Sequence, residues 1–73
     1  MKAEPIALAN DLLDVVVDEA CAPGRPITLE VGELSLDAKS RGTQKRADGR
    51  FDLKVRLVGI RREEREQLQS LIG

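Results

Sequence analysis

Three kinds of side chain in this sequence could do chemistry: one thiol, thirteen carboxylates and twelve basic groups. The thiol of Cys21 would need a neighbouring base to become a nucleophile, and the chain has no histidine. Paired carboxylates perform acid–base catalysis only where a concave site holds them, and a chain of 73 residues has little room for one. A zinc site would need more thiolates or imidazoles. We therefore expect no catalytic residue, no metal and no cofactor, and a protein that is not an enzyme.

Five of the twelve basic residues gather in one stretch, residues 39–50, which also carries Gly42 and Gly49. No apolar side chain there is larger than that of Ala47. This composition predicts a solvated, basic loop that binds a partner, either an acidic protein surface or phosphates. A solvated hairpin tip that only keeps the sheet soluble is the alternative. The candidate partner-binding residues are Lys39, Arg41, Lys45, Arg46 and Arg50.

A second group of cations lies near the end of the chain and forms a secondary candidate surface: Arg61, Arg62 and Arg65. Over the whole chain 13 acidic and 12 basic residues nearly cancel, so no overall field attracts nucleic acid or a membrane. Phe51 is the only aromatic residue, which argues against base stacking. We expect a small regulatory protein that binds a protein partner through the basic loop, the sheet edge or both, with nucleic acid as the alternative. A second copy of the chain also remains open, because so small a core gains from association.

Two helices are expected to flank a sheet. Glu4-Pro5 has the form of a helix start, and the apolar residues that follow have helical spacing: Leu8, Leu12, Val15, Val16 and Ala20. The β-branched run from Val15 to Val17 favours a strand instead, so residues 5–20 remain open between helix and strand. The last segment, residues 61–72, is rich in helix formers and predicts a C-terminal helix.

Between them, residues 26–60 predict a three-stranded antiparallel meander. Ile27, Leu29 and Val31 alternate, and after Gly32-Glu33 the apolar parity changes. A two-residue turn explains the change because it pairs Val31 with Leu34 on one face; a bulge in one long strand is the alternative. The third strand covers residues 51–57. The residues expected to be most buried are Leu29, Leu36, Leu53, Val55 and Leu68.

These elements define an α+β fold: an N-terminal helix, a small three-stranded sheet and a C-terminal helix, in one domain of residues 1–73. No segment approaches the roughly 20 apolar residues of a membrane span. The N-terminus also lacks the basic flank and apolar run of a signal peptide. We therefore expect a cytoplasmic protein.

The order of these parts resembles the C-terminal half of PilZ domains. Such domains run through a Pro-Gly turn, two strands joined by a tight turn, a variable loop, a strand with an early phenylalanine and a helix rich in Glu, Arg and Leu. The matching parts are Pro23-Gly24, residues 27–31, residues 34–38, residues 51–58 and residues 61–72.

The ligand-binding motifs of that family do not carry over. PilZ domains that bind cyclic di-GMP use an Arg-x-x-x-Arg segment and then an Asp/Asn-x-Ser-x-x-Gly segment, and residues 3–18 contain no arginine. Asp11 could start the second motif, but Leu13 stands where serine is needed. Arg61 and Arg65 have the four-residue spacing but lie in the last helix. The resemblance implies a divergent module that acts through protein contacts.

Overall fold

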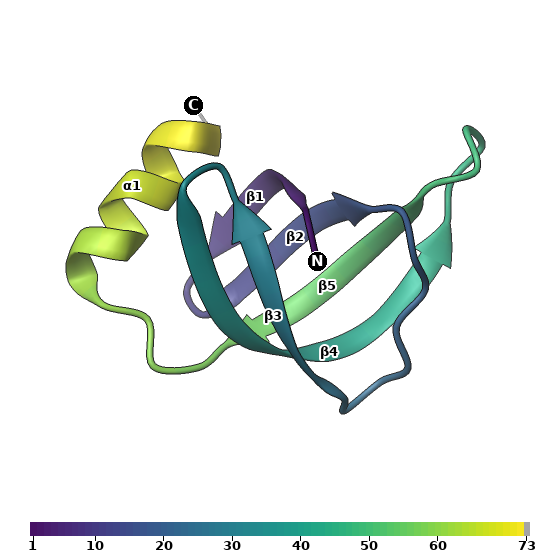
Figure 1. Ribbon diagram of the computed structural model, residues 1–73, viewed down its shortest axis with the longest axis horizontal. Helices are drawn as coiled ribbons and strands as arrows, with labels where there is room; N and C mark the ends of the chain where they lie inside the picture. The colour runs from purple at the N-terminus through teal and green to yellow at the C-terminus, as the bar shows by residue number, and fades with distance from the viewer. Residues whose placement is uncertain (73) are drawn as a thin grey trace.

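The computed structural model describes residues 1–72, which form five strands and one helix (Figure 1). All pairings between neighbouring strands are antiparallel, and the strand order across the sheet is β1-β2-β5-β4-β3. The elements are β1 (Glu4–Ala9), β2 (Leu12–Val17), β3 (Pro26–Val31), β4 (Leu34–Lys45), β5 (Phe51–Leu57) and α1 (Arg62–Ile72).

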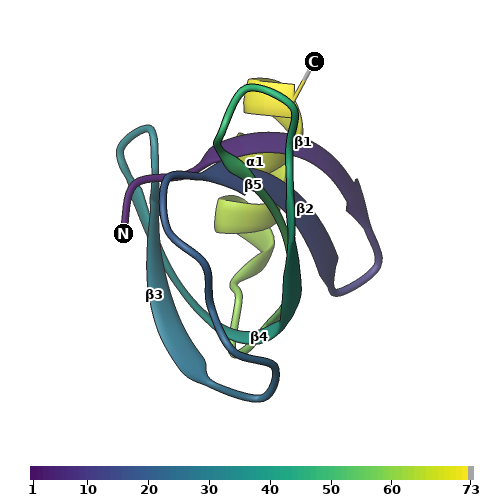
Figure 2. The same ribbon diagram turned by 90° about the vertical axis from the view of Figure 1, so that its right-hand side faces the viewer.

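The sheet curls until its two ends meet. The segment before β1 pairs with β3 through a parallel bridge between Lys2 and Glu30. Ala3 N–H donates to the Glu30 carbonyl at 2.9 Å, and Glu30 N–H donates to the Met1 carbonyl at 2.7 Å. Figure 2 shows the strands wrapping around a common interior. The sheet therefore has an inner face, which is the core, and an outer face.

The inner face is aliphatic and α1 closes one end of it. Leu13, Leu29, Val55 and Leu68 have no exposed surface, and Leu68 is the only buried residue of α1. In Figure 1, α1 lies beside the β3–β4 turn, while the β4–β5 connection projects at the opposite end of the sheet. Among residues 1–72 this is the one helix, and its eleven residues are too short and too polar to cross a membrane.

The predicted N-terminal helix is wrong. Residues 4–17 form the hairpin β1–β2, in which Ala9 pairs with Leu12 across a two-residue turn. Asn10 occupies that turn at a φ of +56°, a conformation that asparagine tolerates better than most residues. The β-branched run from Val15 to Val17, which favoured a strand, lies in β2.

The three-stranded meander and the long basic loop are also corrected. The sheet has five strands, and β4 continues through residues 39–45, so only residues 46–50 connect β4 to β5. In this part of β4 the inward position is held by Ser40, which is 2% exposed. Its Oγ accepts a hydrogen bond from Gly42 N–H at 3.2 Å. A strand with small and polar inward residues does not show apolar alternation.

The predictions of the tight turn, the last helix and the most buried residues are confirmed. Gly32 and Glu33 form a tight turn, with Val31 paired to Leu34 and Leu29 paired to Leu36. The last helix is present as α1. All five residues predicted to be most buried have at most 3% of their surface exposed: Leu29, Leu36, Leu53, Val55 and Leu68.

Candidate interaction surface

Four cations lie on the outer face of β4 and β5, and we call them the basic face: Lys39, Arg41, Lys54 and Arg56. Lys39 and Arg56 are direct cross-strand partners, so their side chains leave the sheet on the same side. Pro26 of β3 pairs with Lys39 on its other side. Adjacent strands are about 4.8 Å apart, so the two charges start from neighbouring positions.

A bulge places Arg41 next to this pair. Ser40 pairs with Val55 and Thr43 pairs with Leu53, so Arg41 and Gly42 together stand opposite Lys54. Arg41 and Lys54 line a shallow outer groove of about 600 Å³ with the exposed Ile6 of β1. The bulge therefore extends the basic face from one row of the sheet to the next.

Three of the four cations have no carboxylate of residues 1–72 within ion-pairing distance, namely Lys39, Arg41 and Arg56. The fourth, Lys54, lies 3.8 Å from the Asp14 carboxylate, with both side chains about half exposed. Such exposed pairs contribute little energy. The basic face thus presents charges that the described chain does not itself neutralise.

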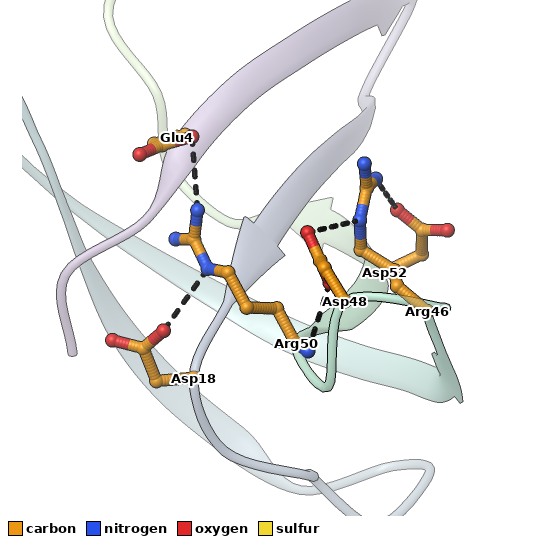
Figure 3. A network of polar contacts seen from close by, with 6 residues as sticks. All are labelled: Glu4, Asp18, Arg46, Asp48, Arg50 and Asp52. Carbon is orange, nitrogen blue, oxygen red and sulfur yellow. Dashed lines mark hydrogen bonds and ion pairs between the residues drawn. The ribbon is translucent and has the colours of Figure 1, made fainter.

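Arg50, by contrast, is bound to the protein's own carboxylates (Figure 3). Its Nε lies 3.0 Å from Asp18, and a terminal nitrogen lies 3.3 Å from Glu4. Desolvation opposes the charge of this guanidinium, but the hydrogen bonds and charges of Glu4 and Asp18 outweigh it and hold the pKa of Arg50 above its usual value. This arginine joins the β4–β5 connection to the N-terminal hairpin.

Arg46 is engaged on the other side of the same connection. One terminal nitrogen lies 2.7 Å from Asp52, and Nε lies 3.6 Å from Asp48. The hydrogen bond and charge of Asp52 raise the pKa of Arg46. Asp48 accepts a hydrogen bond from Arg50 N–H at 3.0 Å, and this bond is the main reason that the pKa of Asp48 is lowered. Arg46 and Arg50 therefore hold the hairpin tip together.

The remaining predicted cations do not join the basic face. Lys45 lies six residues beyond Lys39 on β4, about 20 Å along an extended strand. In α1, Arg62 pairs with Glu66 at 3.5 Å. Arg65 pairs with Asp11 at 2.9 Å and also donates to the Asn10 carbonyl, which attaches α1 to the β1–β2 turn. Arg61 is exposed just before α1.

Sequence reasoning named Lys39 and Arg41 but did not select Arg56 or Lys54 as site residues. The signal was present, since both occupy outward positions in the clear alternation of β5. What was missing was the pairing of β5 with residues 39–45, which had been assigned to a loop.

The two edge strands are poor templates for an added strand. β1 contains Pro5, which lacks a backbone N–H, and its pairing with β2 is broken by a bulge at Ile6. β3 begins at Pro26, and its Glu30 is already paired with the N-terminal segment. The outer face of β4–β5 is therefore a better candidate for binding than the sheet edges.

The described residues offer little for other chemistry. The lone thiol of Cys21 is buried, as expected for a small packing residue, with Sγ 3.9 Å from Met1 Sδ. Within residues 1–72 no three metal-ligating side chains lie together.

Comparison with known proteins identified no relative. No family model, no curated protein and no solved structure matches this chain.

Proposed function

We propose that this is a small, non-enzymatic regulatory protein of the cytoplasm that docks on an acidic protein surface through its basic face. One observation carries the proposal. Lys39, Arg41 and Arg56 stand together on the outer face with no carboxylate partner in the part of the chain that the structure describes. In contrast, Arg46, Arg50 and Arg65 are each engaged by the protein's own acids.

Charge complementarity of this kind gives specificity and fast association. Exposed charges steer a partner from a distance, and salt screens them beyond about 10 Å at 0.1 M. The acidic side chains near the face, Asp14, Asp37 and Asp52, limit its overall potential. A short, locally basic patch suits a local acidic patch on a protein better than a long phosphate backbone.

The test compares two triple variants with the same net charge. Lys39→Glu, Arg41→Glu and Arg56→Glu together reverse the face. Lys2→Glu, Lys45→Glu and Arg62→Glu together change the net charge by the same amount, but at positions outside the basic face. Binding of labelled poly-L-glutamate is measured by fluorescence anisotropy at 50 mM and 300 mM salt, with melting temperature as a folding control.

We expect the first triple variant to lose binding at low salt and the second to retain most of it. Equal losses would show that net charge alone matters and would refute the proposed site.

Nucleic acid is the second candidate. It is supported by the same cations and opposed by the lack of exposed aromatic residues, since Phe51 is partly buried. A duplex DNA probe in the same assay decides between them. Tighter binding of DNA, with a steep salt dependence, would favour nucleic acid over an acidic protein.

The divergent PilZ-type module is a further proposal, resting on the order of sequence elements alone. Calorimetric titration with cyclic di-GMP tests it, and we expect no heat of binding because residues 3–18 contain no arginine that could match the family's motif.

A further inference from the structure

A small apolar groove borders the basic face. It has a volume of about 280 Å³ and is lined by Pro26, Ile27, Thr28, Asp37, Ala38, Lys39 and Val58. Val58 follows β5 directly and leaves 51% of its surface exposed. Its backbone is nevertheless fixed, because Val58 N–H donates to the Asp37 carbonyl at 2.9 Å. The groove therefore presents to solvent an aliphatic side chain whose backbone is held in place.

Of the polar side chains at the rim, some bind a neighbouring side chain of the protein and others do not. Asp37 Oδ1 accepts a hydrogen bond from Thr28 Oγ1 at 3.2 Å. Lys39, on the same rim, has no carboxylate partner among residues 1–72, and Arg56 stands opposite it on β5. Two unneutralised cations beside the groove outnumber the single carboxylate of Asp37, so the groove is complementary to a segment that is both acidic and apolar.

We propose that the groove takes one aliphatic side chain of an acidic peptide segment, whose flanking carboxylates pair with Lys39 and Arg56. This deepens the proposed function and rests on it. The volume is below the roughly 300–1,000 Å³ of pockets for drug-sized ligands, so it suits a single side chain. In an extended peptide, the residues two positions before and after the inserted one project to the same side as it does, toward the surface that carries the cations.

The choice of an acidic protein segment over nucleic acid follows from Val58. A phosphate backbone gains nothing from an exposed valine, whereas an aliphatic side chain buries it. Each buried methylene changes a binding constant by a factor of about four. The apolar contact should therefore appear as a dependence on the central residue of the peptide.

The experiment uses two fluorescein-labelled probes. Each probe has one central residue with two acidic residues on each side of it. The central residue is leucine in the first probe and serine in the second. Their affinities for the full chain are measured by anisotropy at 50 mM salt. Val58→Ser is the test variant. Leu71→Ser on α1 is the matched control, because Leu71 is also 51% exposed but lies away from the groove.

We expect the leucine probe to bind at least about fivefold more tightly than the serine probe. Val58→Ser should remove this preference, and Leu71→Ser should leave it. Amide NMR shifts should change at Ala38, Lys39 and Val58 when the leucine probe is added. Both variants should melt close to the wild type, since the replaced side chains are exposed.

Equal binding of the two probes, or a leucine preference that survives Val58→Ser, would overturn this inference. If the double variant Lys39→Glu with Arg56→Glu nevertheless lost binding of both probes, the proposed function would stand without the groove. If the charge reversal changed nothing, the proposed function itself would fail.

Discussion

Lys39 of β4 and Arg56 of β5 face each other directly across two hydrogen-bonded strands. Like charges in this position destabilise a sheet, whereas opposite charges stabilise it. Lys54, one row along β5, shows the usual solution, because it pairs across the sheet with Asp14 of β2. The Lys39–Arg56 pair has no such compensation within residues 1–72, which is expected of a surface whose counter-charge comes from a partner.

Removing one charge of that pair should therefore stabilise the protein. We expect Lys39→Thr to raise the free energy of unfolding by about 0.2–1 kcal/mol at low salt, because it removes like-charge repulsion while keeping a good strand former. Urea denaturation at 20 mM and 500 mM salt measures it, and the gain should shrink at high salt. Lys54→Thr, which loses the pair with Asp14, is the control. The same gain in both variants would indicate strand propensity rather than charge.

Docking of α1 should depend on a single side chain. Leu68 has no exposed surface, whereas Leu71 on the same helix is 51% exposed. We expect Leu68→Ala to cost about 2–5 kcal/mol, because it leaves a cavity in the core. Leu71→Ala should cost much less. Thermal unfolding of both variants, followed by circular dichroism, gives the comparison. Similar losses would mean that α1 is held by its ion pairs instead.

Acid should weaken the β4–β5 connection through Asp48. The pKa of this carboxyl lies below its ordinary 3.8, mainly because Arg50 N–H donates to it, with the charges of Arg46 and Arg50 acting in the same direction. A lowered folded-state pKa contributes stability at pH values above the unfolded pKa and loses it as pH falls through the folded one. We therefore expect Asp48→Asn to be less stable than wild type near pH 7 and to approach it below about pH 4.

Melting temperatures between pH 2.5 and 7 test this, and a ¹³C NMR titration of the carboxyl gives the pKa directly. Parallel pH profiles for wild type and Asp48→Asn would contradict the assignment.

The β3–β4 turn should not tolerate a side chain at Gly32. Its φ is +59°, and a Cβ there would lie 3.3 Å from Cδ1 of Leu71. Gly24 also has a positive φ, +81°, but a Cβ there would meet nothing within 4 Å. We expect Gly24→Ala to cost about 1–2 kcal/mol through the left-handed backbone alone, and Gly32→Ala to cost more. The excess should disappear in the double variant Gly32→Ala with Leu71→Ala, as urea denaturation would show. An excess that persists would locate the strain in the turn itself.

The hairpin from Ile27 to Ala38 could be predicted from sequence because its inner and outer residues differ in polarity at every step. The turn followed from the change of parity at Gly32. The clear alternation in β5 allowed the same inference for Leu53 and Val55. In these strands one face is buried and the other solvated, and that contrast is what a sequence displays.

The N-terminal hairpin could not be predicted in this way because β2 has little polar contrast. Leu13, Val15, Val16 and Val17 are all buried, so the apolar residues of β2 follow no period of two. Val15 and Val16, taken with Leu8, Leu12 and Ala20, imitate helical spacing. The turn residue Asn10 marked the hairpin, but an asparagine is also common on the polar side of a helix.

The basic face was only half predictable. The abundance of cations in residues 39–50 was evident, but which of them are neutralised depends on Glu4, Asp18 and Asp52, which only folding brings alongside. No local pattern connects Arg50 with a carboxylate 32 residues earlier. Charge content can be read from a sequence, whereas charge neutralisation requires the strand order.

The strand order also determines how the chain must fold. β1–β2 and β3–β4 are hairpins between neighbours in sequence, and β5 follows β4 through a short connection. The seam between β2 and β5 is different, since it joins Leu12 to Arg56 and Val17 to Phe51. Forming this seam requires closure of a long loop before any of its contacts is gained. We therefore expect the pairing of β2 with β5 to be the slow step, and folding to take milliseconds to seconds rather than the microseconds of small helical bundles.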